Sequence, residues 1–235
     1  MKIVLTSAMR NTLQLVPRYF RQVAGLYLAA AERGTSIYVL IGEGDSTDAT
    51  RYALEESMRT LGLPGALIDT THGGPSFGSI INAKRFAQLA SVYNTLWRCI
   101  PDDADAVVFV EGDLIWKPEM MLALVDRLDM HSAVAPMVFH LPDYAGYGGV
   151  RAFYDTWGFA IGGQHFGNLP PYHVAVNSHP VRLDHAGSCI AMRAEAARRV
   201  YFPAEDMVVG MTRMLADNGD PVWLQPDLYL EHPNV

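Results

Sequence analysis

The sequence predicts an α/β protein whose mostly parallel sheet carries helices on both faces. Short β-branched apolar runs alternate with longer segments of helical spacing through roughly the first 140 residues, as in a chain of βα units. Glycine, proline, aspartate and serine separate these segments and indicate turns. Half of the 235 residues are hydrophobic and 18% are charged, which supports a large core and argues against disorder. One domain over residues 1–235 is expected, because no internal repeat is present.

The first half of the chain alternates regularly. Strands are inferred from apolar runs such as residues 106–110. Helices are inferred from apolar residues three or four positions apart, such as Tyr19, Val23 and Leu26, followed by the closing Gly34. Strands are expected at residues 2–6, 36–41, 63–69 and 106–110, and helices at residues 12–33, 49–61, 80–99 and 118–129.

The pattern loosens in the second half. A strand at residues 133–139 precedes a segment, residues 141–180, that is rich in Gly, Pro, Tyr and His and has no clear period. Long irregular segments in compact enzymes usually serve as lids or binding loops. Further strands are expected at residues 186–192, 221–224 and 229–233, and helices at residues 194–200 and from about 206 to 218.

Composition and charge bound the function. The net charge of −7 gives no overall attraction to nucleic acid or anionic membranes, although a local basic groove stays open. The two cysteines, Cys99 and Cys189, match no metal spacing and suit free thiols in a reducing compartment. No apolar run is long enough to span a membrane, and the N-terminal run is too short for a signal peptide. A cytoplasmic location, in a bacterium or a phage-infected host, is therefore expected.

Two acidic residues end the strand at residues 106–110. Glu111 and Asp113 flank a glycine directly after this apolar run. Carboxylates are costly to bury unless they are paired or bind a cation. In open α/β sheets ligands bind beyond the carboxyl ends of the strands, where oxygen ligands suit a hard divalent ion. An acidic turn without a ligand remains the alternative.

Four other groups carry candidate chemistry. Residues 42–48, which include Glu43 and Asp45, are either a capped strand-to-helix turn or a nucleoside site. On the helix at residues 80–99, Arg85 suits phosphate, whereas Asn94 either binds ligand or faces solvent. Glu205 and Asp206 precede a helix, where they serve either as cap residues or as catalytic carboxylates. The remaining candidates are His232 near the C-terminus and, in the irregular segment, Asp155 and Trp157.

These segments, in this order, resemble the GT-A family of nucleotide-sugar glycosyltransferases. In that family a strand ends in Asp-x-Asp, which holds a divalent metal on the donor diphosphate, and Glu111-Gly112-Asp113 matches it with one conservative departure. The turn at residues 42–48 looks like the turn after the family's second strand. The remaining matches are Lys84-Arg85, Ala90 and Asn94 on a helix, the glycine loop at Gly187, the x-Glu-Asp motif at Glu205 and Asp206, and a C-terminal His232.

The resemblance implies a GT-A, Rossmann-like fold, a nucleoside-diphosphate sugar as donor, and Mn²⁺ or Mg²⁺ as cofactor. The implied metal ligands are Asp113, His232 and Glu111, the last directly or through water. The implied donor contacts are Thr6, Ser7, Glu43, Asp45, Arg85, Asn94 and Gly187. The implied catalytic residues are Asp206, Glu205 and Asp155, with Asp206 as base if the reaction inverts the anomeric centre and as acceptor-orienting group if it retains it.

A narrower resemblance is to fungal-type α-mannosyltransferases of capsule and cell-wall synthesis. It depends on the pattern from Arg85 to Asn94 and on residues 153–157. Those enzymes carry membrane anchors and longer stems, which this sequence does not show. A glycan, a soluble or lipid-linked acceptor or a hydroxylated DNA base is therefore compatible with it.

Two other classes stay open. A nucleotidyltransferase would share the fold and the acidic site, but it usually carries a glycine-rich loop after its first strand, and residues 6–11 contain no glycine. A non-catalytic sugar- or nucleotide-binding module would explain the aromatic residues between Tyr144 and Tyr172. For a DNA acceptor, the candidate groove residues are Arg10, Arg18, Arg21, Arg193, Arg198 and Arg199, which otherwise belong to solvated helix faces.

Overall fold

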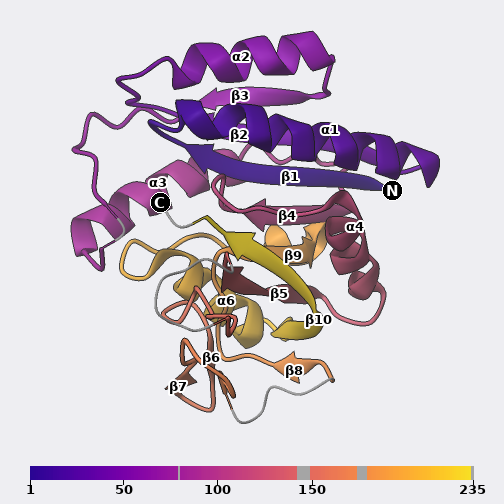
Figure 1. Cartoon of the computed structure of the whole chain (residues 1–235), viewed down its shortest axis with the longest axis vertical. Coiled ribbons are helices and arrows are strands. Elements are labelled where there is room, and N and C mark those ends of the chain that lie inside the picture. Colours follow the sequence, from indigo (N-terminus) through magenta and orange to yellow (C-terminus); the bar gives the residue numbers. More distant parts are fainter. Residues whose placement is uncertain (79, 142–148, 174–178, 234–235) are drawn as a thin grey trace.

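The computed structural model describes residues 1–78, 80–141, 149–173 and 179–233. Its centre is an eight-stranded sheet in the order β3-β2-β1-β4-β9-β5-β10-β8 (Figure 1). The strands of this sheet are β1 (Lys2–Met9), β2 (Ser36–Glu43), β3 (Gly65–Asp69), β4 (Ala106–Val110), β5 (Ala133–His140), β8 (Val181–Arg182), β9 (Cys189–Arg193) and β10 (Val222–His232). A separate two-stranded sheet pairs β6 (Ala160–Ile161) with β7 (Gln164–His165).

The sheet is mostly parallel, as predicted. β1 pairs in parallel with β2 and β4, β2 with β3, and β5 with β10. β9 lies between β4 and β5 and is antiparallel to both, and β8 is antiparallel to β10. The arrowheads of β1, β3, β4 and β10 in Figure 1 therefore point toward one edge, beside α3 and the C-terminus.

Helices cover both faces of the sheet, because successive strand residues point to opposite sides. The helices are α1 (Val16–Glu32), α2 (Thr50–Leu61), α3 (Ala83–Trp97), α4 (Pro118–Asp126), α5 (Ala194–Ala197) and α6 (Met207–Asp217). On β1, Ile3 and Leu5 join the core beneath α1, α2 and α4. Val4 joins the opposite core with α3, α5 and α6.

Local chemistry moves several expected boundaries. A 3₁₀ turn, η1 (Leu13–Leu15), precedes α1, which begins at Val16 with Pro17 in its first turn. α3 begins at Ala83 rather than at residue 80, because the Asn82 side chain caps it by accepting hydrogen bonds from two backbone amides. The two final strands expected from the sequence form one strand, β10, with a register shift between Gln225 and Tyr229.

The irregular segment is partly described. Its described portions contain the β6–β7 pair, and Phe153 forms an isolated bridge to Phe139 of β5. Residues 142–148 and 174–178, including Tyr144, lie outside the described residues. Within the described portions of the chain, no helix combines the length and apolar character needed to cross a membrane.

Candidate active site

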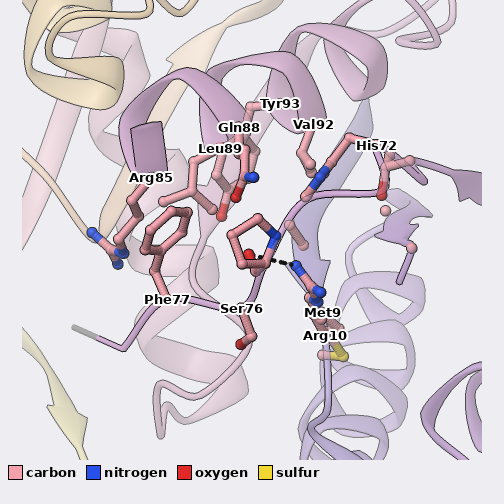
Figure 2. A pocket seen from close by; sticks show the side chains of 15 residues that line it. Met9, Arg10, His72, Ser76, Phe77, Arg85, Gln88, Leu89, Val92 and Tyr93 are labelled. Atoms are coloured by element: carbon pink, nitrogen blue, oxygen red, sulfur yellow. Dashed lines mark hydrogen bonds between the residues drawn. The ribbon is translucent and has the colours of Figure 1, made fainter. Parts of the chain in front are cut away.

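Three pockets that share lining residues form one cleft where the parallel strands end. The first, called here the α3 pocket, lies between the end of β1, the loop after β3 and α3 (Figure 2). The acid pocket contains Glu111 and Asp113, and the aromatic pocket contains Phe86, Asp155 and Trp157. Arg85 lines all three pockets.

The α3 pocket has a rigid polar wall. Arg10 donates hydrogen bonds to the carbonyl oxygens of Asp45 at 3.2 Å, Gly74 at 3.0 Å and Pro75 at 3.2 Å. The Asp45 carboxylate accepts from the backbone nitrogens of His72 at 2.9 Å and Gly73 at 3.1 Å. The hydrogen bond from the His72 backbone is the main cause that lowers the pKa of Asp45. Asp45 therefore supports the wall and does not line the pocket.

Three other residues expected to contact the nucleoside are buried beneath the pocket. The Thr6 hydroxyl donates to the Val108 carbonyl at 3.2 Å, and the Ser7 hydroxyl to the Val110 carbonyl at 2.9 Å. The Glu43 carboxylate pairs with Arg51, at 3.2 Å between Oε2 and Nη1. None of the three lines the pocket. From this part of the chain, the lining residues are Ala8, Met9 and Arg10, which follow Ser7 directly.

Side chains on α3 form the opposite wall of the α3 pocket. In Figure 2, Gln88, Leu89 and Tyr93 stand across it from Met9 and Arg10. Met9, Gln88, Leu89 and Tyr93 were not among the predicted site residues, and Arg10 was considered only as a DNA contact. A signal for the α3 residues was present in the sequence. Residues three or four positions apart, such as Arg85, Gln88 or Leu89, and Tyr93, lie on one face of a helix, so they could have been expected to face the same ligand as Arg85.

Next to Asp113 of the acid pocket, the turn after β4 meets the end of β10. His232 Nε2 lies 3.3 Å from Asp113 Oδ2, and the His232 ring stacks on Tyr154 with centroids 3.7 Å apart. Ile115 and Glu231 exchange two backbone hydrogen bonds, 2.7 and 2.9 Å, which hold the two segments together. Residues from distant parts of the sequence thus meet at one point.

The Asp113–His232 pair fits a divalent cation. Within the described residues, Asp113 Oδ1 and His232 Nδ1 are buried without a hydrogen-bond partner. Carboxylate and imidazole are a donor set that suits such ions. No three His, Cys, Asp or Glu side chains of the described chain form a metal-binding group, so Glu111 does not complete a set of three here.

Glu111 lines both the acid and the aromatic pockets, and the Asp155 carboxyl lines the aromatic pocket. Ser188 Oγ donates to Asp155 Oδ2 at 2.5 Å, and the Gly158 nitrogen donates to Oδ1 at 2.8 Å. Loss of hydration raises the pKa of Asp155 despite these bonds. It also raises the pKa of Glu111 well above its usual range, with the charges of Asp113 and Asp155 adding to the effect. This setting favours a carboxyl that takes up a proton.

Two glycines allow the Asp155 carboxyl its position. A Cβ at Gly187 would lie 2.3 Å from Oδ2, and one at Gly158 would lie 2.4 Å from Oδ1. Side chains at either place would displace the carboxyl. Gly187 thus packs against Asp155.

The remaining predicted residues lie elsewhere. Asn94 exchanges two hydrogen bonds of 2.8 Å with the backbone of Phe202, and it lines none of the three pockets. Glu205 is exposed. Asp206 pairs with Arg213, at 2.7 Å between Oδ2 and Nη1, and also lies outside the three pocket linings.

Comparison with known proteins extends the description of the fold. No family model matches the chain, and no curated protein matches it. Among solved structures, S. aureus TarS 1–349 has a TM-score of 0.60 at 15% identity, covering 99% of this chain and 60% of TarS 1–349. The same protein in complex with UDP gives a TM-score of 0.58 at 14% identity, with 99% and 60% covered. The chain has a GT-A-like fold. This chain spans about 60% of the length of these two TarS structures.

The GT-A-like fold extends to other enzymes. The 4-diphosphocytidyl-2C-methyl-D-erythritol synthase of Anaerococcus prevotii matches with a TM-score of 0.50 at 10% identity, covering 98% of this chain and 87% of that one. At these identities the likeness concerns the fold alone. The chemistry of the site must therefore be inferred from its own residues.

Most of the arginines considered for a DNA groove contact their own chain. Arg10 holds the loop described above, and Arg18 donates to the Asp113 carbonyl at 2.5 Å. Arg193 and Arg198 donate to the carbonyls of Leu128 and Asp102, at 2.6 and 2.7 Å. Arg199 pairs with Asp220. These guanidiniums stabilise turns, which limits what they offer to a phosphate backbone.

Proposed function

We propose that the chain is a metal-dependent glycosyltransferase that moves a sugar from a nucleoside-diphosphate sugar to a hydroxyl acceptor. The observation that carries this proposal is the continuous cleft in which Arg85 joins the α3 pocket to the carboxyls of Glu111, Asp113 and Asp155. A nucleotide, its diphosphate and an acceptor hydroxyl would occupy its three parts in that order. The location, beyond the carboxyl ends of the strands, is where such sheets bind ligands.

The donor would lie along α3. The nucleoside fits between Tyr93 and the wall held by Arg10, and Arg85 supplies positive charge to the diphosphate. Asp113 and His232 would hold Mn²⁺ or Mg²⁺. When bound, such an ion neutralises charge on the leaving nucleoside diphosphate.

Asp155 is our candidate for the carboxyl that faces the acceptor hydroxyl. It lines the cleft and is held by Ser188 and Gly158, whereas Asp206 is paired with Arg213 outside the pocket linings. In an inverting reaction Asp155 would accept the proton, and in a retaining one it would orient the hydroxyl. This replaces Glu205 and Asp206 as the first candidates.

The narrower expectations remain proposals. They are a hexosyl or pentosyl donor, a likeness to fungal-type α-mannosyltransferases, a cytosolic location, and a glycan, lipid-linked or DNA-borne acceptor. No residue of the described cleft distinguishes between the donor sugars.

The deciding experiment is release of nucleoside diphosphate from a panel of nucleotide sugars, with Mn²⁺ and with EDTA. The proposal expects metal-dependent release that an acceptor accelerates. Pyrophosphate release from a nucleoside triphosphate and a sugar phosphate would instead indicate a nucleotidyltransferase. Binding of nucleotide, seen as a raised unfolding midpoint without turnover, would indicate a binding module.

A further inference from the structure

We infer that the acceptor carries an apolar group next to its reacting hydroxyl, and that the aromatic pocket binds that group. This inference rests on the proposed function and names the chemical class of its acceptor. It starts from the lining of the aromatic pocket, which combines carboxyl and hydroxyl groups with large apolar side chains. Its members are Ile80, Ile81, Arg85, Phe86, Glu111, Tyr154, Asp155, Thr156, Trp157, Ser188, Met207 and Val208.

The mouth of the aromatic pocket exposes apolar surface. Ile80 is 50% exposed and Ile81 is 75% exposed, side by side before the start of α3. Single exposed apolar residues are normal, but a contiguous apolar border around a pocket marks a binding surface. An apolar group that leaves the pocket across these two side chains would remove them from water.

The apolar surface continues into the pocket. Phe86 and Trp157 stack with ring centroids 5.1 Å apart and planes at 26°, so each covers one face of the other. Met207 and Val208, at the start of α6, are 4% and 2% exposed. Met207 has φ of 51°, a conformation that side chains rarely adopt, and it lines both the aromatic and the acid pockets.

Polar residues also line the aromatic pocket, and three of them are linked to one another. Asp155, Ser188 and Glu111 are joined by the hydrogen bond between Asp155 and Ser188 and by the backbone bond from Glu111 to Ser188. A hydroxyl would bind there. A polar substituent directed at the isoleucines and the aromatic pair would lose its hydration there, which is costly unless it finds a hydrogen-bond partner. An alkyl or acyl chain next to the hydroxyl has no such cost.

The test compares methyl and hexyl glycosides of glucose, galactose and mannose, below the concentration at which the hexyl compounds form micelles. Calorimetric titration without donor measures binding, and nucleoside diphosphate release measures the KM of each acceptor. Each methylene removed from water strengthens binding about fourfold. For at least one sugar, we expect the hexyl compound to bind at least tenfold more tightly than its methyl partner and to show a correspondingly lower KM.

The matched variants are Ile81→Ser and Leu28→Ser. Both remove an exposed aliphatic side chain, but Leu28, 66% exposed on α1, lies outside the three pockets. The Ile81 variant should lose most of the preference for the hexyl compounds, and the Leu28 variant should keep it.

The two proposals fail in different ways. Equal binding of methyl and hexyl compounds, or a preference that Ile81→Ser leaves intact, would overturn the apolar subsite even if donor turnover is metal-dependent. A hexyl preference in titration that depends on Ile81, without turnover of any donor, would support the subsite and refute the glycosyltransferase.

Discussion

Asp113 and His232 are the two residues on which the metal assignment depends. Their side chains approach to 3.3 Å, and each keeps one buried atom without a hydrogen-bond partner in the described structure. An ion pair alone would leave those atoms unsatisfied at a cost. We propose that a cation bound by Asp113 Oδ1 would satisfy that oxygen, with His232 Nε2, the ring nitrogen that faces Asp113, as the second ligand.

We expect Asp113→Ala to reduce metal-dependent release of nucleoside diphosphate on the order of 100-fold, because one of the two proposed ligands is lost. The rise in unfolding midpoint with Mn²⁺ and nucleotide should shrink as well. Asp217→Ala, an exposed carboxylate at the end of α6, is the control and should behave as the parent protein. Full metal-dependent transfer by the Asp113 variant would make the assignment wrong.

The Asp155 carboxyl predicts a pH-dependent stability effect. Loss of hydration raises its pKa in the folded state, so its contribution to stability is present in acid and is lost as the pH rises through that raised pKa. Asp155→Asn keeps the side chain neutral at every pH. In thermal unfolding, this variant should melt a few degrees above the parent at neutral pH, and the difference should vanish below the ordinary pKa of aspartate.

Asp155→Asn should also lower acceptor-dependent turnover, since it removes the candidate carboxyl from the cleft. A variant that is more stable but less active would show that the carboxyl is retained for function at a cost in stability. A destabilised Asp155→Asn protein at neutral pH would contradict the proposed desolvation.

At the scale of elements, the loop that precedes β9 sets the geometry of the site. Gly187→Ala would place a methyl group against the Asp155 carboxyl, because the added Cβ would lie 2.3 Å from Oδ2. Turnover should fall roughly 100-fold while nucleotide binding in the α3 pocket persists. Gly167→Ala is the matched control, since its Cβ would meet the carbonyl oxygens of Tyr172 at 3.5 Å and Leu169 at 3.9 Å, both ordinary contacts.

Asn94 connects α3 to the segment before α6. Its side chain both donates to and accepts from the backbone of Phe202, at 2.8 Å in each case. Asn94→Ala should therefore lower the free energy of unfolding by about 1–3 kcal/mol in urea titration. The KM for the donor should stay unchanged. A raised KM with unchanged stability would instead restore Asn94 as a donor contact.

The elements themselves were largely predictable. Apolar runs and helical spacing identify the strands and helices around the acidic turn, because both patterns follow from burying one face. The cap at Asn82 and the continuity of β10 were not predictable in this way. The first depends on the Asn82 side chain accepting hydrogen bonds from the backbone of α3. The second depends on β10 continuing to pair with β5 beyond the register shift between Gln225 and Tyr229.

The site was predictable only in part. Glu111, Asp113, Asp155 and Arg85 do line one cleft, because the ends of parallel strands meet at one edge. Sequence order does not reveal which side chains turn inward there. Thr6 and Ser7 satisfy carbonyls of β4, and Arg10, which was considered only for DNA, lines the α3 pocket instead.

At the scale of the whole molecule, charge argues against a nucleic-acid surface. The chain carries a net charge of −7, and five of the six arginines considered for a groove contact their own chain. On immobilised double-stranded DNA, we expect no retention near physiological salt. Retention that falls steeply as salt is raised would contradict this expectation and favour a DNA acceptor.

The position of β9 has a consequence for how the protein is made. This strand lies between β4 and β5 but follows both in the chain, so the centre of the sheet closes only after residues 189–193 have left the ribosome. Every residue that lines the α3 pocket precedes β4, whereas Ser188 and His232 are synthesised late. The residues that line the α3 pocket are therefore synthesised before the groups proposed here to bind the cation and the acceptor.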